Sequence, residues 1–341
     1  MKRVLVTGAS GFVGRWLLPR LVEAGAQVLA LGLEAESLAV PAYGAPEWPS
    51  SVTWRFGDIR SDDFLQSSVA EAAADTVIHL AAISHVRTAA ANPGVAWDVN
   101  VSATARLLHW LDESRQESGV DPLVLLAGSA EQYGWEEGRP GPLAEDARQL
   151  PRTVYAATKA AQEILAFQMH RSIGLRCIVA RSFNHSGPGQ LPRFLIPALV
   201  SRVRALGESG AGGLPVGVAG SASSAGSGAL ARLPAGNLSP VRDYLHVSDV
   251  VDAYILLCQR GTVGEAYNVA SGTGWSVREV LDRVLARAGV RAEPVEDPQL
   301  VRPVDVPVLV GDPRKLQAAT GWQPSHSLDN IIDDLLNAET Y

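Results

Sequence analysis

Short apolar runs alternate, along the first half of the chain, with longer runs whose apolar residues recur at helical spacing. The short runs predict β-strands at residues 3–7, about 27–33, about 52–57, 76–80, 123–126 and 177–180. The longest helical pattern covers roughly residues 93–118, and another helix is predicted to begin near Tyr155. Strands that alternate with helices in this way predict an α/β fold with a doubly wound parallel sheet.

The pattern becomes less regular beyond about residue 184, where prolines are more frequent. Strand–helix–strand and helix patterns return at about 242–270 and 276–289. We therefore predict a larger sheet domain and a smaller C-terminal α/β region over the carboxyl edge of the sheet. Their expected bounds are 1–183 joined by about 242–266 for the first, and 184–241 with 267–341 for the second. Residues 207–228, rich in Gly, Ala and Ser, predict a flexible insertion, which a solvated loop explains more simply than a binding lid.

A glycine-rich turn separates the first predicted strand from the helix that follows it. Its sequence, Gly8-Ala9-Ser10-Gly11-Phe12-Val13-Gly14, has the spacing G-x-x-G-x-x-G. Glycines at such a turn let backbone N–H groups approach a pyrophosphate at the helix N-terminus, as in Rossmann dinucleotide sites. Asp58, after the third strand, is placed to meet an adenine amino group. The predicted cofactor contacts are Gly8, Ser10, Gly11, Phe12, Val13, Gly14, Asp58, Ile59, Leu80, Ala81, Ala82, Tyr155 and Lys159.

Tyr155 and Lys159 lie four residues apart and therefore on one face of the predicted helix. A free phenol has a pKa of about 10, and a neighbouring ammonium favours the phenolate, so we expect Lys159 to lower the pKa of Tyr155. Ser129 follows the fifth strand, where its hydroxyl can bind a substrate oxygen. Glu131 faces the same pocket if the chain stays extended; otherwise Ser129 caps a turn and Glu131 is solvated.

Composition restricts the classes of partner. The chain of 341 residues is 47% hydrophobic and 19% charged, as in an ordinary globular protein. Its 29 Lys and Arg against 36 Asp and Glu give a net charge of −7, which argues against nucleic acid or an anionic membrane. No run has transmembrane length, the N-terminal apolar run is too short for a signal peptide, and Cys177 and Cys258 are expected as buried free thiols. We therefore expect a cytoplasmic protein, and no residues have the spacing of a metal site.

Taken together, the glycine turn, Ser129 and Tyr155-x-x-x-Lys159 resemble the extended short-chain dehydrogenase/reductases, the NAD-dependent epimerase/dehydratase family that acts on nucleotide sugars. Within it the chain is most similar to the GDP-4-keto-6-deoxy-D-mannose reductases. The segments that carry this similarity are 181–190, 241–244, 302–307, 311–313 and 321–324. The related GDP-mannose 4,6-dehydratases typically continue Asn-His with Glu-Ser-Pro and carry a basic segment after the second strand. Here Asn184-His185 is followed by Ser186-Gly187-Pro188-Gly189-Gln190, and residues 32–37 are not basic, so both departures favour the reductase.

The resemblance implies a role for each candidate residue. In the reductive direction, Tyr155 donates a proton to the oxygen at C4 of the sugar, Ser129 orients that oxygen, and Lys159 binds the nicotinamide ribose. The expected substrate contacts are Ser84, Ser129, Asn184, Arg242 and Arg302, with the arginines on the diphosphate. Glu131 is the fourth catalytic candidate; dehydratases use a matching glutamate as a base at C5, and reductases have one too.

Several alternatives stay open at this stage. The cofactor is NADP or NAD, because Gly32 stands where NAD-preferring members often have an acid and no arginine lies nearby in the sequence. The activity is reduction, 4,6-dehydration or another nucleotide-sugar epimerase or dehydratase reaction, and a non-catalytic NAD(P) sensor is the least expected reading. A homodimer is expected by resemblance, through apolar helix residues that can equally pack on the sheet: Leu107, Leu108, Leu111, Ala160, Ile164, Leu165 and Phe167.

Overall fold

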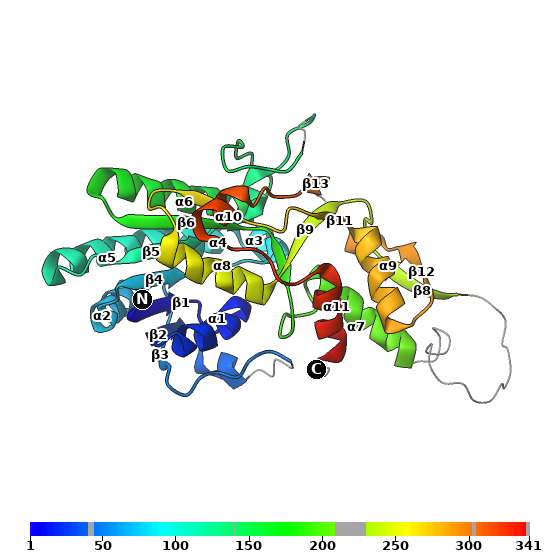
Figure 1. Cartoon of the computed structure of the whole chain (residues 1–341), viewed down its shortest axis with the longest axis horizontal. Coiled ribbons are helices and arrows are strands. Elements are labelled where there is room, and N and C mark those ends of the chain that lie inside the picture. The colour runs from blue at the N-terminus through cyan, green and yellow to red at the C-terminus, as the bar shows by residue number, and fades with distance from the viewer. Residues whose placement is uncertain (40–43, 139–140, 209–229, 302–304, 339–341) are drawn as a thin grey trace.

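Seven parallel strands form the central sheet of the computed structural model, which describes residues 1–39, 44–138, 141–208, 230–301 and 305–338. Their order is β3-β2-β1-β4-β5-β6-β10 (Figure 1). Their bounds are β1 Arg3–Thr7, β2 Gln27–Gly32, β3 Thr53–Phe56, β4 Thr76–His79, β5 Leu123–Ala127, β6 Arg176–Ser182 and β10 Ala266–Val269. The predicted doubly wound α/β fold is confirmed, and the strand order reverses between β1 and β4, where such sheets bind ligands.

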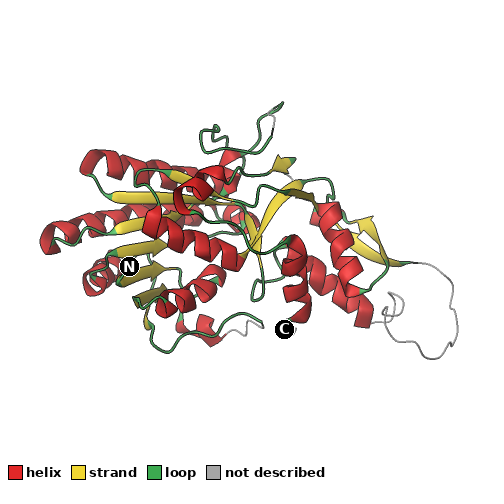
Figure 2. Cartoon of the chain, in the orientation of Figure 1, coloured by secondary structure: helices red, strands yellow, loops and turns green. Residues whose placement is uncertain are grey.

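Helices cover both faces of this sheet (Figure 2). One layer contains α1 (Phe12–Glu23), α8 (Val247–Arg260) and α10 (Arg314–Thr320). The other contains α2 (Asp62–Ala72), α5 (Ala103–Ser118) and α6 (Val154–Ile173). Successive strand residues point to opposite sides of the sheet. Because these strands are apolar at successive positions, both faces of the sheet are apolar.

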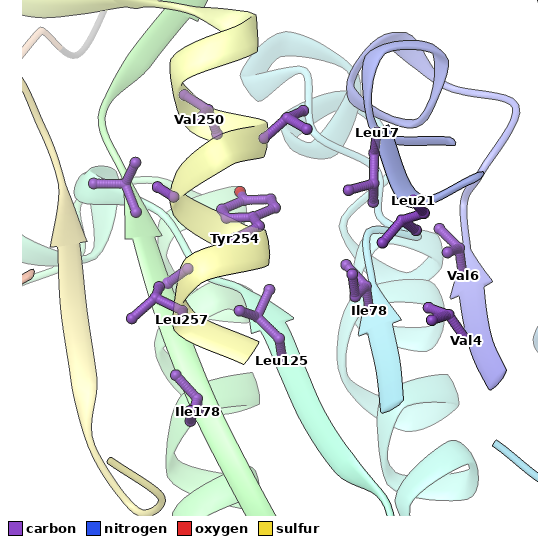
Figure 3. Packing of buried hydrophobic residues seen from close by; sticks show 14 of the residues in the cluster. Val4, Val6, Leu17, Leu21, Ile78, Leu125, Ile178, Val250, Tyr254 and Leu257 are labelled. Atoms are coloured by element: carbon purple, nitrogen blue, oxygen red, sulfur yellow. The ribbon is translucent and has the colours of Figure 1, made fainter. Parts of the chain in front are cut away.

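The alternation is visible within β1. Val4 and Val6 pack with Leu17 of α1 in the first layer (Figure 3). Leu5, between them, packs with Leu65 of α2 in the other. A strand buried on both sides therefore reads as a continuous apolar run, which is why the strands were visible in the sequence.

The helix expected at 93–118 is interrupted. It begins at Pro93 as α4 (Pro93–Trp97), passes through a π-helical turn at Asp98–Ser102, and continues as α5; α3 (Val86–Ala91) precedes it. A single π turn inserts an extra residue into a helix and often marks a functional position. Here the turn contains Asn100, which is fully buried.

Three leucines expected at a dimer interface lie instead inside the protein. Leu107, Leu108 and Leu111 of α5 are buried against the sheet. For these residues the alternative, packing on the sheet, is correct. Ile164 of α6 is different, with 64% of its surface exposed.

A second hydrophobic core lies beyond the carboxyl ends of the strands, on the right of Figure 1. Helices α7 (Leu195–Glu208), α9 (Val277–Ala288) and α11 (Leu328–Asn337) share it. Two small sheets accompany them: β7 Asn184–Ser186, β9 Val241–His246, β11 Gly274–Ser276 and β13 Val308–Leu309 in one, β8 Ala231–Ala235 and β12 Ala292–Glu296 in the other. The division into two domains stays a prediction. Of the insertion expected at 207–228, the first two residues end α7 and the rest lie outside the described residues.

The cysteines agree only partly with expectation. Cys177 in β6 is buried, but Cys258 in α8 is only half-buried. Burial raises the pKa of both thiols to about 12, so both stay protonated near neutral pH. Within the described residues, every helix is too short or too polar to cross a bilayer.

Candidate active site

The glycine turn between β1 and α1 leaves room for a ligand's phosphates. Gly8 has φ +66°, and a Cβ there would lie 2.6 Å from the backbone of Ala81, so only glycine fits. A Cβ on Gly14 would lie 2.0 Å from the carbonyl oxygen of Ala9. Gly11 begins α1 without a side-chain cap, so the first N–H groups of the helix have no partner from a capping side chain. The turn therefore fits a dinucleotide pyrophosphate.

Of the other predicted cofactor residues, Ser10, Phe12 and Val13 belong to this turn and the start of α1, and Leu80 and Ala81 lie against Gly8. Ser10, Phe12, Val13, Ile59, Leu80 and Ala82 are half-buried, and Ala81 is buried at the end of β4. Asp58 binds the backbone N–H and the guanidinium of Arg60, which holds the pKa of its carboxyl below the usual range. An adenine amino group would thus meet a carboxylate that already has a cationic partner.

Cofactor choice depends on the end of β2. A Cβ on Gly32 would lie 2.9 Å from the ring of Phe56 and 3.2 Å from Ser10 Oγ. A carboxylate side chain therefore does not fit there without movement. The structure offers no acidic side chain at this position for a ribose 2′-hydroxyl, in line with the sequence.

Ser129 and Tyr155 meet beyond the end of β5. Tyr155 stands in the first turn of α6 and hydrogen-bonds Ser129. Burial raises the pKa of Tyr155 to about 12, against the hydrogen bond from Ser129, which lowers it. The expectation that Lys159 brings this pKa down is therefore wrong for this structure. Tyr155 is a neutral phenol near neutral pH.

Lys159 explains the difference. Its side chain is 3% exposed, and its ammonium donates to Ala127 O at 2.8 Å and to Gln162 Oε1 at 2.9 Å. Burial lowers the pKa of Lys159 to about 7, so the amine is only partly charged at neutral pH. A partly charged amine that is bonded elsewhere does little to stabilise a phenolate.

Ser129 both caps a turn and reaches the site. The chain does not stay extended after it but turns into a 3₁₀ helix at Ala130–Tyr133, with Ser129 Oγ accepting from Glu131 N at 3.2 Å. Gln132 Oε1 accepts from Ser129 N at 2.7 Å and fixes the start of the turn. Glu131 is half-buried, and its charge raises the pKa of Tyr155. The two candidates thus lie close together although the extended geometry was wrong.

Behind Ser129 lies a buried ion pair that the sequence did not reveal. Arg181 Nη2 and Glu163 Oε1 are 2.5 Å apart, with 6% and 5% of their side chains exposed. Glu163 also accepts from Gln132 at 3.0 Å, and Arg181 donates to Tyr133 Oη at 2.7 Å. The sequence signal for this pair was a polar residue within the predicted helix after Tyr155. A solvent-exposed helix position would show the same residue type, so the sequence alone does not identify the pair.

Asn100, in the π turn, is a further residue that sequence reasoning missed. Its side chain binds the backbone of Ile83 through N–H···O bonds of 2.8 and 3.3 Å and donates to Thr158 Oγ1 at 2.9 Å. It therefore ties the segment after β4 to the residue beside Lys159. A period of 3.6 residues does not anticipate a π turn, so the pattern could not place Asn100 at the site.

The predicted substrate residues are less closely gathered. Asn184 lies half-buried in β7. Two contacts of neighbouring residues place this segment beside the cofactor turn: His185 stacks on Phe12, and Trp16 Nε1 donates to Pro188 O at 3.2 Å. Ser84 is exposed in the segment after β4.

Arg242 in β9 is buried and donates to Asp305 at 2.5 Å and to Val241 O at 2.9 Å. Arg302 lies outside the described residues, so its predicted contact with the diphosphate stays a prediction.

Comparison with known proteins is consistent with this geometry. A family model described as GDP-mannose 4,6 dehydratase matches residues 5–335. The chain is 30% identical to a GDP-6-deoxy-D-mannose reductase of Pseudomonas aeruginosa, over 98% of this chain and 96% of that protein.

Two solved structures have the same fold. RMD from Pseudomonas aeruginosa, complexed with NADPH, superposes with a TM-score of 0.77 at 29% identity and covers 98% of both chains. A UDP-glucose 4-epimerase of Thermus thermophilus, in complex with NAD, has a TM-score of 0.77 at 28% identity, covering 98% of this chain and 99% of that one.

Proposed function

The chain belongs to the GDP-mannose 4,6-dehydratase family of extended short-chain dehydrogenase/reductases, and we propose that it reduces the C4 keto group of GDP-4-keto-6-deoxy-D-mannose. The protein is an NAD(P)-dependent oxidoreductase that acts on a nucleotide sugar. The product we propose is a GDP-6-deoxyhexose, GDP-D-rhamnose or its C4 epimer. The glycine turn fits NADP or NAD, and when bound the reduced nicotinamide supplies the hydride for C4.

Two findings support the choice of reduction: Asn184-His185 is followed by Ser186-Gly187-Pro188-Gly189-Gln190, and the chain is 30% identical to the GDP-6-deoxy-D-mannose reductase over 98% of its length. Reduction of a ketone needs a proton for the oxygen at C4, whereas dehydration and epimerisation begin by removing a proton from a C4 hydroxyl. With its pKa raised to about 12, Tyr155 is held as a phenol that can donate. Ser129, bonded to Tyr155, orients the same oxygen, and both act on one atom of the sugar.

The remaining residues bind and position the substrate in this proposal. Lys159 holds the nicotinamide ribose, and Asn184, Arg242 and Arg302 hold the sugar and diphosphate, with Ser84 at the rim. Two arginines suit a diphosphate because guanidinium groups pair two phosphate oxygens at once. Glu131 has a positioning role in reduction.

The direct test is purified protein with GDP-4-keto-6-deoxymannose and either NADH or NADPH. We expect loss of nicotinamide absorbance with at least one cofactor. Unchanged absorbance with both would refute the reductase proposal. Melting shifts with GDP, UDP and dTDP test the base, and the proposal requires the largest shift from GDP.

A second candidate, 4,6-dehydration of GDP-mannose, is favoured by Glu131. Its charge acts on Tyr155, and the dehydratases use a matching glutamate as the base at C5. Incubation with GDP-mannose and oxidised cofactor separates the two reactions. A keto sugar formed without net change in the nicotinamide would establish the dehydratase.

We also propose a homodimer through the exposed apolar residues of α4 and α6. Val95 and Trp97 are each 41% exposed, and Ile164 is 64% exposed, on helices that pack against each other. Ile164→Asp should shift the protein toward monomer in sedimentation at micromolar concentration, because a carboxylate does not transfer into an apolar interface. A wild-type protein that already sediments as a monomer would contradict the proposal.

A further inference from the structure

Gln162 is a buried side chain of α6 that contacts Lys159 and has no role so far. It is 1% exposed, three residues along the helix from Lys159, and its Oε1 accepts from Lys159 Nζ at 2.9 Å. A buried ammonium needs acceptors for its protons, and the second one found here, Ala127 O, is part of the backbone. Gln162 is therefore the acceptor that substitution can change.

The orientation of its amide follows from counting protons at Thr104. Thr104 has one hydroxyl proton, which it donates to Asn100 O at 2.8 Å, because a carbonyl can only accept. Its oxygen then accepts from Gln162 Nε2 at 3.0 Å and from His79 Nε2 at 2.8 Å. With its nitrogen committed to Thr104, Gln162 must present its oxygen to Lys159.

The chain of bonds continues to the strand before the glycine turn. In a neutral His79 ring with its proton on Nε2, Nδ1 is the acceptor and faces Thr7 Oγ1 at 2.6 Å. Burial, together with the charge of Lys159, lowers the pKa of His79 to about 3, in agreement with a neutral ring. Thr7, His79, Thr104, Gln162 and Lys159 are all at most 3% exposed, so solvent does not replace these bonds.

We propose that Gln162 is a positioning residue for Lys159: its fixed amide oxygen favours the charged form of the amine and orients the side chain toward the predicted cofactor site. Since Ala127 O and Gln162 Oε1 take two of its three N–H bonds, the third is left for a ribose hydroxyl. This effect on Lys159 does not depend on the reaction. Its consequence for turnover rests on the proposed reductase function.

The ionisable groups near Lys159 lie on β4 and on α6 itself, and they interact with groups on the 3₁₀ helix, α8 and β6. His79 of β4 interacts with it electrostatically and is neutral. Tyr155, one turn earlier on α6, is a neutral phenol under the influence of Glu131 and Tyr254. Glu163, the next residue after Gln162, is paired with Arg181. A change at Gln162 alone should therefore dominate the titration of Lys159.

The test is a pair of substitutions with opposite expected signs. Gln162→Met removes the acceptor at nearly the same volume, so the pKa of Lys159 should fall by about one unit. Gln162→Glu adds a carboxylate, so this pKa should rise by a similar amount or more. The sequence has three lysines, Lys2, Lys159 and Lys315, so nuclear magnetic resonance of labelled lysine side chains follows Lys159 directly.

Controls separate this role from ordinary packing. Gln168→Met and Gln168→Glu make the same changes on an exposed part of α6 and should leave Lys159 unchanged. If the variants at 162 do not fold, Thr104→Val should lower the pKa of Lys159 by freeing the amide to flip, while Thr104→Ser should preserve it. A Lys159 titration that is unmoved, or moved in one direction by both substitutions at 162, would overturn the proposal.

Kinetics provide a second readout. The basic limb of kcat/KM should move to lower pH in Gln162→Met and to higher pH in Gln162→Glu, following Lys159. Opposite shifts of Lys159 in a protein that turns over no GDP-sugar would refute the reductase function and leave the role of Gln162 standing. Turnover of the GDP-sugar without a shift in the Lys159 titration would refute the role of Gln162 and leave the reductase function standing.

Discussion

Among the described residues, two arginine–carboxylate pairs contain a buried arginine, one behind Ser129 and one in the small sheet, and they differ in what surrounds them. Arg181–Glu163 is enclosed, with 6% and 5% exposure and further bonds to neutral side chains. Arg242–Asp305 is half-open, because Asp305 is 20% exposed. The first pair is fully occupied and holds the catalytic turn in place. The second leaves its carboxylate, Asp305, partly accessible to solvent, while the Arg242 side chain is 6% exposed.

Removing the hydroxyl of Tyr155 should have the largest effect on kcat. It tests the proton donor that stands next to the turn held by the enclosed pair. Tyr155→Phe should lower kcat by about 10²–10⁴-fold, because the proton donor is lost while the ring remains. Steady-state kinetics with a melting curve would measure this. Tyr267→Phe, which loses a bond to Thr262 N at the far end of β10, is the matched control and should retain kcat. A Tyr155→Phe enzyme with kcat near wild type would contradict the donor role.

Breaking the enclosed pair should affect stability most. Arg181→Met leaves Glu163 as a buried carboxylate without its cation, at a cost of about 3–5 kcal/mol in the free energy of unfolding. Urea unfolding measures this cost. Replacing both residues by Met should recover much of the loss, since no buried charge is then unpaired. If Arg181→Met proves no more damaging than the double variant, the pair is not the enclosed unit described here.

Breaking the half-open pair should instead affect substrate binding. Arg242→Gln should raise KM for the GDP-sugar by about 10–100-fold, corresponding to the 1.5–3 kcal/mol of a charged hydrogen bond, with little change in kcat. Asp305→Asn keeps the arginine and removes only the charge of its partner, so its KM separates the contribution of Arg242 from that of the ion pair. A fall in kcat at unchanged KM would show that Arg242 acts in the chemical step. Loss of folding would show that this pair, like Arg181–Glu163, mainly stabilises the protein.

Acid should destabilise both regions through buried neutral histidines. Burial lowers the pKa of His79, in the sheet, to about 3, and of His246, in β9, to about 4, from an ordinary 6.5. Below pH 6.5 the unfolded chain binds protons that the folded chain does not, so stability falls as pH falls toward those values. Between pH 6.5 and 5 each histidine should cost about 2 kcal/mol. The measurement is urea unfolding at both pH values, and His246→Gln should flatten the slope by one histidine's share; an unchanged slope would contradict the assignment for His246.

The sequence predicted the parts of the molecule that follow a regular period. Continuous apolar runs located β1 to β6, and the glycine turn was recognisable because close approach of Gly8 to Ala81 excludes other residues. The family, the enzyme class and the NAD(P) cofactor were confirmed by the comparisons. The chemical roles of Ser129, Tyr155 and Lys159 stay predictions, although the structure brings them together.

What the sequence did not predict depends on long-range packing. Gln162 and Glu163 resemble solvent-facing residues of any helix until the sheet covers them. The raised pKa of Tyr155 arises from burial that no spacing encodes, and the π turn at Asn100 breaks the helical period. These features belong to the tertiary structure. The sequence therefore identified the candidate residues but did not predict the direction of the pKa shift of Tyr155.

The central claim, reduction at C4, is tested most directly by following a label. The protein would be incubated with GDP-4-keto-6-deoxymannose and nicotinamide cofactor deuterated at the transferable position. The account predicts one deuterium on C4 of the sugar for each cofactor oxidised, and Tyr155→Phe should slow its appearance. Cofactor that keeps its deuterium while the keto sugar stays unreduced would contradict it.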